Sequence, residues 1–141
     1  MTVLKTIRIF KTEMKSLFIE KLLAFDFSNE DADKCADIFT QNSLDGVYSH
    51  GVNRFPRFID FLKKGYVIPK NKPLLKNQLG VIEQWDGESG PGPLNAAFAT
   101  NKALDLANKY GIGCVALSNT NHWMRGGYYA WQAATKGSIF I

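Results

Sequence analysis

Apolar positions in the first half of the chain recur at the spacing of α-helices. Three segments show this pattern, and each is bounded by residues that start or stop helices. Ser28 is a typical N-cap, and Pro56 suits a first helical turn because its φ is fixed and it lacks an N–H. The predicted helices cover residues 12–24, 28–42 and 56–65. The pattern therefore predicts an N-terminal helical unit over residues 1–70.

The pattern changes after Pro69, where short apolar runs alternate with helical segments. Residues 67–79 are rich in proline and lysine and are predicted to be an exposed connection. We expect strands at 81–85, 112–117 and 138–141, a loop at 90–93, and helices at 94–110 and 127–135. This order predicts a layered α/β domain over residues 71–141.

The last predicted strand, Ser138-Ile139-Phe140-Ile141, is almost wholly apolar. An apolar strand of this kind needs neighbours on both sides and cover on both faces. Three short strands would form a small and poorly covered sheet. We therefore expect an incomplete, truncated α/β domain that is the first part of something larger, or one that completes itself by oligomerisation.

Composition and charge narrow the possible functions. The chain is 45% hydrophobic and 21% charged, which is typical of a globular protein and not of a disordered one. Its net charge of +4 is spread along the sequence, so we expect no nucleic-acid partner, whereas a small anionic substrate fits. No apolar run approaches the length of a membrane span, so we expect no membrane partner.

The cysteines and the N-terminal residues indicate the cellular compartment in which we expect the protein. Cys35 and Cys114 lie among apolar residues and are predicted to be small buried side chains, with no spacing that would bind a metal. The N-terminal fifteen residues lack the continuous apolar region of a signal peptide. We therefore expect a reducing, cytoplasmic location.

The first candidate for chemistry is Ser49-His50-Gly51-Val52-Asn53-Arg54. His50 can act as a general acid or base near neutral pH, although a histidine that only satisfies loop backbone groups would look the same. Arg54 can hold a carboxylate through two parallel hydrogen bonds, and the alternative is a surface salt bridge. Pro56 indicates that the regular helix begins after both residues, so their relative geometry stays open.

The second candidate is the polar segment from Ser118 to Gly127, which contains Asn119 and His122. It follows a predicted buried strand and precedes a helix, and ligand-binding loops of open α/β sheets lie at such places. Its single Arg-Gly-Gly is a weak match to RNA-binding segments. The glycine-rich stretch before residue 94 lacks the G-x-G-x-x-G pattern, and its prolines remove amides that could bind phosphate.

Three sequence motifs together resemble those of a known family: Gly46-Val-Tyr-Ser-His-Gly-Val-Asn-Arg-Phe-Pro56, Ile82-Glu-Gln-Trp-Asp86 and Asn121-His-Trp-Met-Arg-Gly-Gly127. In this order they are similar to the malate/L-lactate dehydrogenase type 2 family of NAD(P)-dependent oxidoreductases. The resemblance extends from about Ile7 to Ile141, and residues 1–6 look like an N-terminal addition.

The resemblance implies that NADH, or NADPH, reduces the ketone of a 2-keto sugar acid. His50 matches the proton donor, and Arg54, Asn119 and His122 match positions at the substrate. It also implies a homodimer and a non-Rossmann cofactor fold, with most cofactor-binding residues beyond the end of this chain. Family members are more than twice as long, so a non-catalytic remnant that acts as an oligomerising module is the alternative function.

Overall fold

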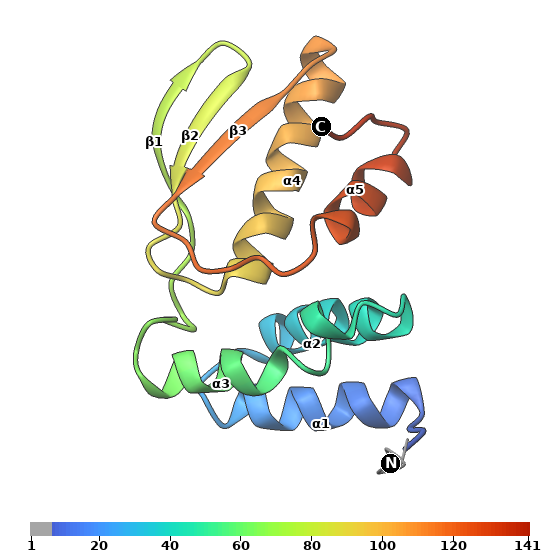
Figure 1. Cartoon of the computed structure of the whole chain (residues 1–141). Coiled ribbons are helices and arrows are strands. Elements are labelled where there is room, and N and C mark those ends of the chain that lie inside the picture. Colours follow the sequence, from blue (N-terminus) through green and yellow to red (C-terminus); the bar gives the residue numbers. More distant parts are fainter. Residues whose placement is uncertain (1–6) are drawn as a thin grey trace.

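The computed structural model describes residues 7–141, in which a layer of helices lies beneath a small α/β unit (Figure 1). The predictions for residues 1–6 lie outside the described part of the chain. The helical layer contains α1 (Lys11–Leu23), α2 (Asn29–Leu44), the 3-10 turn η1 (Tyr48–His50) and α3 (Phe55–Lys63). The predicted fold class, helices followed by the start of an α/β sheet, is confirmed.

Local sequence signals explain where these helices begin. The Ser28 hydroxyl oxygen accepts a hydrogen bond from the Asp31 N–H at 3.1 Å and thereby caps α2. Pro56 lies in the first turn of α3, as expected from its missing donor. His50 is the last residue of η1, and α3 begins at Phe55, so the regular helix does begin after His50 and Arg54.

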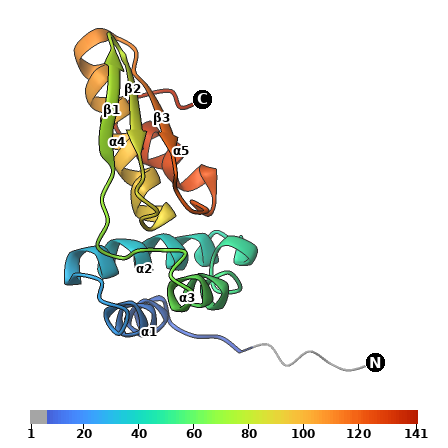
Figure 2. The same ribbon diagram turned by 90° about the vertical axis from the view of Figure 1, so that its left-hand side faces the viewer.

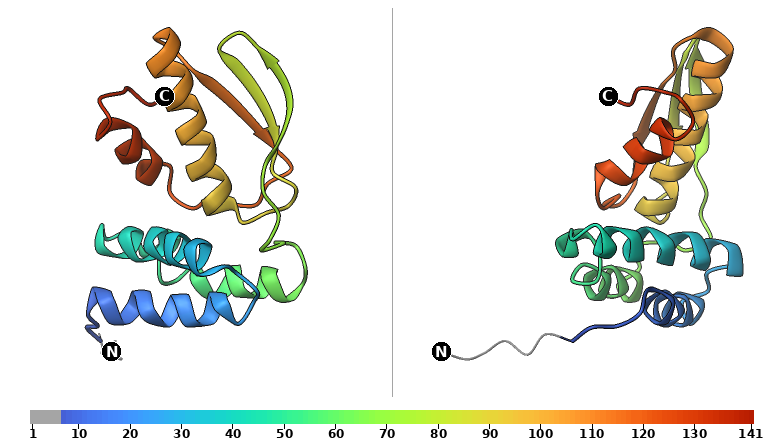
Figure 3. Two further views of the ribbon diagram at one scale, coloured as in Figure 1. Left: turned by 180° about the vertical axis from the view of Figure 1, so that it is seen from behind. Right: turned by 90° about the vertical axis from the view of Figure 1, so that its right-hand side faces the viewer.

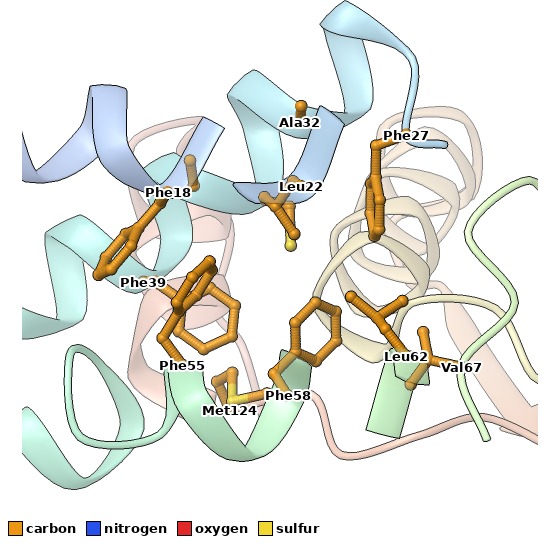
Figure 4. Close-up of a cluster of buried hydrophobic side chains, with 12 residues drawn as sticks. Phe18, Leu22, Phe27, Ala32, Phe39, Phe55, Phe58, Leu62, Val67 and Met124 are labelled. Carbon is orange, nitrogen blue, oxygen red and sulfur yellow. The ribbon is translucent and has the colours of Figure 1, made fainter. Parts of the chain in front are cut away.

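Aromatic side chains from three helices form the core of the helical layer (Figure 4). Phe39 of α2 is fully buried and lies at its centre. Its ring centroid is 6.2 Å from that of Phe18, 5.1 Å from that of Phe55 and 5.3 Å from that of Phe58. Such tilted and edge-on pairs stabilise a core beyond the area that they bury.

The α/β unit contains β1 (Leu74–Leu79), β2 (Ile82–Asp86), α4 (Gly92–Tyr110), β3 (Cys114–Ser118) and α5 (Gly126–Ala134). The strand order is β1-β2-β3, with β1 antiparallel and β3 parallel to β2. Helix α4 packs on one face of this sheet, where Trp85 meets Phe98 edge-on at 4.7 Å. Helix α5 lies beside α4, and no described helix covers the other face (Figures 1 and 2).

Three expectations from the sequence were wrong. The supposed connection at 67–79 contains β1, whose six residues are all exposed and whose sequence, Leu-Leu-Lys-Asn-Gln-Leu, does not alternate between apolar and polar residues. Residues 138–141 form no strand and do not join the three-stranded sheet. Cys114 is exposed because it lies on the uncovered face of the sheet, whereas Cys35 is buried as expected.

The loop between β3 and α5 contacts the helical layer at several points. Met124 from this loop is buried in the aromatic core of the helical layer, beside Phe55 and Phe58 (Figure 4). The Asn121 side-chain amide donates to the Tyr66 carbonyl at 2.8 Å, and the Arg125 guanidinium pairs with Asp45 at the end of α2. The loop therefore belongs to both layers, which lie one above the other (Figure 3).

No helix among residues 7–141 combines the length and the hydropathy that crossing a bilayer requires.

Candidate active site

His50 is held by the C-terminal end of α2. The buried Asn42 side chain donates from Nδ2 to the His50 carbonyl at 3.1 Å. The Ser43 hydroxyl accepts the Val52 N–H at 2.9 Å. Gly51 makes this contact possible, since any Cβ there would collide with Ser43. The backbone around His50 is thus fixed on both sides, while the imidazole Nδ1 lies 3.0 Å from the exposed Ser49 hydroxyl.

His122 is held by the start of α4 and by its own loop. A Cβ on Gly92 would collide with the carbonyl oxygens of Asn121 and His122, so only glycine lets the loop approach so closely. Met124 has a left-handed backbone, with φ of 71°. Its N–H donates to the His122 Nδ1 at 2.8 Å. The burial of Met124 therefore fixes the orientation of the His122 ring.

The two histidines meet although 71 residues separate them in the chain. Their ring centroids are 5.5 Å apart with an interplanar angle of 45°. Arg54 lies next to them and lines a small pocket with Arg57, Phe61, Asn121 and His122. Three of the four residues that the sequence singled out, His50, Arg54 and His122, thus lie together where the two layers meet.

This site carries positive charge that is not neutralised within the described structure. Among residues 7–141, neither Arg54 nor Arg57 has a carboxylate within salt-bridge distance. Arg57 instead lies over the Phe61 ring, with 5.5 Å between its guanidinium carbon and the ring centroid. An unpaired guanidinium beside two imidazoles is suited to bind a small anion.

His122 is a neutral hydrogen-bond donor in this arrangement. Its Nδ1 accepts the Met124 N–H and so carries no proton, which leaves the proton on Nε2. Partial burial lowers the pKa of His122, and the charges of Arg54 and His50 lower it further. We expect His122 to stay neutral at pH 7 and to offer its Nε2–H to an oxygen acceptor.

The tautomer and the titration of His122 can be measured directly in the 141-residue chain. Because the folded pKa of His122 is lowered, we expect it to titrate below the ordinary value of about 6.5 and to be the Nε2–H form above it. The contribution of neutral His122 to the free energy of unfolding is therefore fully present above the ordinary pKa and is lost as the pH falls through the lowered pKa of the folded protein. Two-bond ¹H–¹⁵N NMR spectra recorded against pH measure both the tautomer and the midpoint.

His122→Gln assigns the signals, since the chain has only two histidines. An Nδ1–H tautomer, or a midpoint at or above the ordinary value, would contradict the assignment of His122 as a fixed neutral donor.

Asn119 has a different environment from the other predicted site residues. Its side-chain amide donates to the Asp86 carboxylate at 3.0 Å, and its carbonyl accepts the Ser89 N–H at 2.9 Å. Asn119 also has a left-handed backbone, with φ of 48°. These contacts join the carboxyl ends of β2 and β3. The hydrogen bonds that the Glu88 N–H and the Asn119 side-chain amide donate to the Asp86 carboxylate lower the pKa of Asp86. A direct contact of Asn119 with a substrate stays a prediction.

Sequence reasoning missed four residues that position the site: Asn42, Ser43, Asn121 and Met124. Asn42 and Ser43 carried a usable signal, since polar side chains on the inner face of an apolar helix need partners inside the protein. The Asn42 Oδ1 atom is itself buried without a partner in the described structure. Met124 carried no such signal, because nothing local shows that a loop methionine enters the core of another layer.

The described residues offer no clear set of ligands for a metal ion and no clear phosphate-binding turn for a dinucleotide. Within residues 7–141, no three His, Cys, Asp or Glu side chains gather closely enough to hold a metal ion. In the glycine-rich turn after β2, Glu88 and Ser89 have a left-handed backbone, and the N–H groups of residues 87–90 already donate hydrogen bonds within the protein, to Ser118, Asp86, Asn119 and Gly87 respectively. These groups are thus not free to bind phosphate, and we assign no described residue to the cofactor.

Comparison with known proteins identifies the class. Residues 9–141 match the malate/L-lactate dehydrogenase family. The chain belongs to this family of oxidoreductases, whose activity implies a nicotinamide cofactor.

Particular relatives are similar over most of this chain. A 2,3-diketo-L-gulonate reductase of Klebsiella pneumoniae (strain 342) is 52% identical over 130 residues, and one of Salmonella newport (strain SL254) is 51% identical over 129. Each alignment covers 92% of this chain and 39% of the relative. The chain therefore spans about two-fifths of the length of these curated relatives.

Solved structures agree with this assignment. Malate dehydrogenase from Pyrococcus horikoshii OT3 superimposes with a TM-score of 0.90 at 33% identity, over 93% of this chain and 38% of that one. Sulfolactate dehydrogenase from Methanocaldococcus jannaschii gives 0.86 at 34% identity, over 89% and 37%. The helical layer and the small sheet thus have the arrangement found in these dehydrogenases.

Proposed function

We propose that this chain carries the substrate-binding and proton-donating part of an NADH-dependent reductase of 2,3-diketo-L-gulonate. The single observation that supports this most strongly is the cluster of His50, Arg54 and His122, cationic and without a carboxylate partner in the described structure. The named function of relatives at about half identity supports the choice of substrate. NADPH is the alternative cofactor.

In this proposal each residue has a separate role. A bound nicotinamide would supply the hydride that reduces the ketone carbon. The protonated His50 ring would give its proton to the ketone oxygen and become neutral. Arg54 binds the substrate carboxylate. His122 donates its Nε2–H to an oxygen of the substrate, and Asn119 contacts the substrate or holds the loop that does. We assign the protein to the cytoplasm and its functional form to a homodimer.

A second candidate function is that of a non-catalytic module that only associates with other chains. The observation in its favour is the large number of exposed apolar side chains, including Leu79 of β1 and Ile139 near the C-terminus, which is 93% exposed. It predicts oligomers in sizing experiments, without ketone reduction in any context.

A chimera distinguishes these functions. Residues 9–141 replace the matching part of the Klebsiella relative, and NADH oxidation with 2,3-diketo-L-gulonate is followed by absorbance. The intact relative is the positive control, and the 141-residue chain alone shows whether these residues suffice. We expect turnover by the chimera. A folded but inactive chimera would favour the non-catalytic function.

Arg54 gives a quantitative prediction in the same chimera. Arg54→Ala should raise KM about 100-fold, because a charge-assisted hydrogen-bond pair contributes about 2–3 kcal/mol. Arg54→Lys keeps the charge but loses the planar fork, and should raise KM about tenfold. Lys64→Ala, at the exposed end of α3, is the control. A larger effect from Arg57→Lys than from Arg54→Lys would assign the clamp to Arg57 instead.

A further inference from the structure

One ion pair joins the two segments that carry the histidines of the candidate site. Arg125 lies three residues after His122 and is the N-cap residue of α5. Asp45 lies five residues before His50 and is the C-cap residue of α2. The Arg125 Nη1 donates to the Asp45 Oδ2, although 80 residues separate the two in the chain. The pair therefore bridges the layers beside both histidine-bearing segments.

The carboxylate of this pair is held on both of its oxygens. The Gln41 side-chain amide, one helical turn earlier in α2, donates to the Asp45 Oδ1 at 2.9 Å. The Asp45 and Arg125 side chains are only 29% and 26% exposed, so water screens their attraction less than that of a fully exposed pair. Charge-assisted hydrogen bonds are about twice as strong as neutral ones. Arg125 thus has a firm partner at a fixed place on α2.

The Gly126-Gly127 sequence that opens α5 has an asymmetric role in this pair. A Cβ on Gly127 would lie 2.9 Å from the Arg125 Nε and 3.2 Å from its Nη2, so it would displace the guanidinium. A Cβ on Gly126 would meet nothing within 4 Å. Neither glycine has a left-handed backbone, so neither is required by its own conformation. Gly127 therefore provides space for the Arg125 side chain.

Arg125 differs from the other two arginines near the histidines. Arg54 and Arg57 have no carboxylate within salt-bridge distance in the described part of the chain, whereas the charge of Arg125 is neutralised by Asp45. A neutralised guanidinium is poorly suited to bind the substrate anion. The role of Arg125 is instead to hold the backbone of its own loop.

That backbone leads directly to the His122 ring. Met124 immediately precedes Arg125, and its N–H donates to the His122 Nδ1 at 2.8 Å. Any shift of the loop at Arg125 moves this N–H, and with it the hydrogen bond that sets the orientation and tautomer of the ring.

We infer that the Asp45–Arg125 pair positions His122. It keeps the His122 ring beside the His50 ring, at the observed 5.5 Å between centroids. Arg125 is thus a positioning residue that touches neither substrate nor cofactor, and Gly127 is conditional on it. The kinetic test of this inference rests on the proposed function, whereas its NMR test does not.

Two-bond ¹H–¹⁵N NMR of the 141-residue chain gives a readout that needs no activity. In the unmodified chain we expect only the Nε2–H tautomer of neutral His122. Arg125→Ala and Gly127→Ala should each give a mixture of the Nε2–H and Nδ1–H tautomers. Gly126→Ala is the matched control and should keep the single tautomer.

Steady-state kinetics of the chimera measure the same effect on turnover. Arg125→Ala should lower kcat about tenfold, less than the 100-fold or so that a 1 Å displacement of a reacting group can cost, because His122 donates a hydrogen bond and transfers no proton. KM should change less than threefold, since Arg54 still binds the carboxylate. Asp45→Ala should have the same effect, and the double variant should lose about tenfold and not about 100-fold, because the two residues act as one unit.

The glycine variants separate positioning from stability. Alanine favours a helix over glycine, so circular dichroism should show both Gly126→Ala and Gly127→Ala melting no lower than the unmodified chain. Even so, Gly127→Ala should lower kcat about fivefold, while Gly126→Ala should change it less than twofold. A residue that only stabilised the fold would give no such difference.

The inference would be overturned by additive losses in the Asp45 and Arg125 variants, or by equal kcat in the two glycine variants. If the chimera itself is inactive, the proposed function fails and the NMR result alone decides the inference. A single Nε2–H tautomer in Arg125→Ala would then show that the pair does not position His122.

Discussion

Replacing His50 by alanine in the active chimera is expected to lower kcat by about 10²–10⁴, the contribution usual for a positioned general acid. The proton that the forming alkoxide takes in our proposal comes from this ring. Without it, the oxygen must be protonated by water, while the Arg54 and His122 contacts to the substrate persist. We therefore expect KM to change little, and steady-state NADH oxidation measures both constants.

The fold should survive this substitution. The Asn42 hydrogen bond goes to the His50 carbonyl, which alanine retains, and within residues 7–141 the ring itself bonds only to the exposed Ser49 hydroxyl. Ser49→Ala is the matched control, because it removes the Nδ1 partner and leaves the proton donor in place. We expect it to lower kcat less than tenfold. Undiminished turnover by His50→Ala would exclude the role that we assign to His50.

The helices were predictable because their inner faces are apolar at a regular spacing. Ser28 and Pro56 marked the beginnings of two of them, and both lie where expected. β1 was not predictable by the same reasoning. It is an edge strand with all six residues exposed, and its stability comes from backbone pairing with β2 across the turn at Gly80. A strand of this kind has no alternation of apolar and polar residues to detect.

Some residues of the candidate site could be predicted from the sequence, and others could not. His50 and Arg54 were candidates from their residue types and loop position alone. That His122 faces His50 could not be predicted, because it depends on Met124 reaching the core of the helical layer and on Gly92 letting the loop approach α4. Such long-range contacts leave no periodic pattern in the sequence. The exposure of Cys114 was missed for a related reason, since the cover of a sheet face depends on which helices are present.

The largest expected loss of stability comes from Phe39→Ala. Phe39 is fully buried and its ring contacts those of Phe18, Phe55 and Phe58, so its removal leaves a cavity among three helices. Truncation of a buried phenylalanine costs about 3–5 kcal/mol. Urea denaturation of the 141-residue chain, followed by circular dichroism, measures the change in the free energy of unfolding.

Leu17→Ala is the control, because Leu17 lies on α1 with 48% of its surface exposed and should cost less than about 1 kcal/mol. Equal losses in the two variants would mean that the aromatic cluster does not hold the helices together. The effect should also reach the candidate site. α2 positions His50 through Asn42, α3 follows directly after Arg54, and Phe39 is the residue that packs these helices against each other. A destabilised Phe39→Ala chain should therefore also lose the fixed tautomer of His122, since Met124 is anchored in the same core.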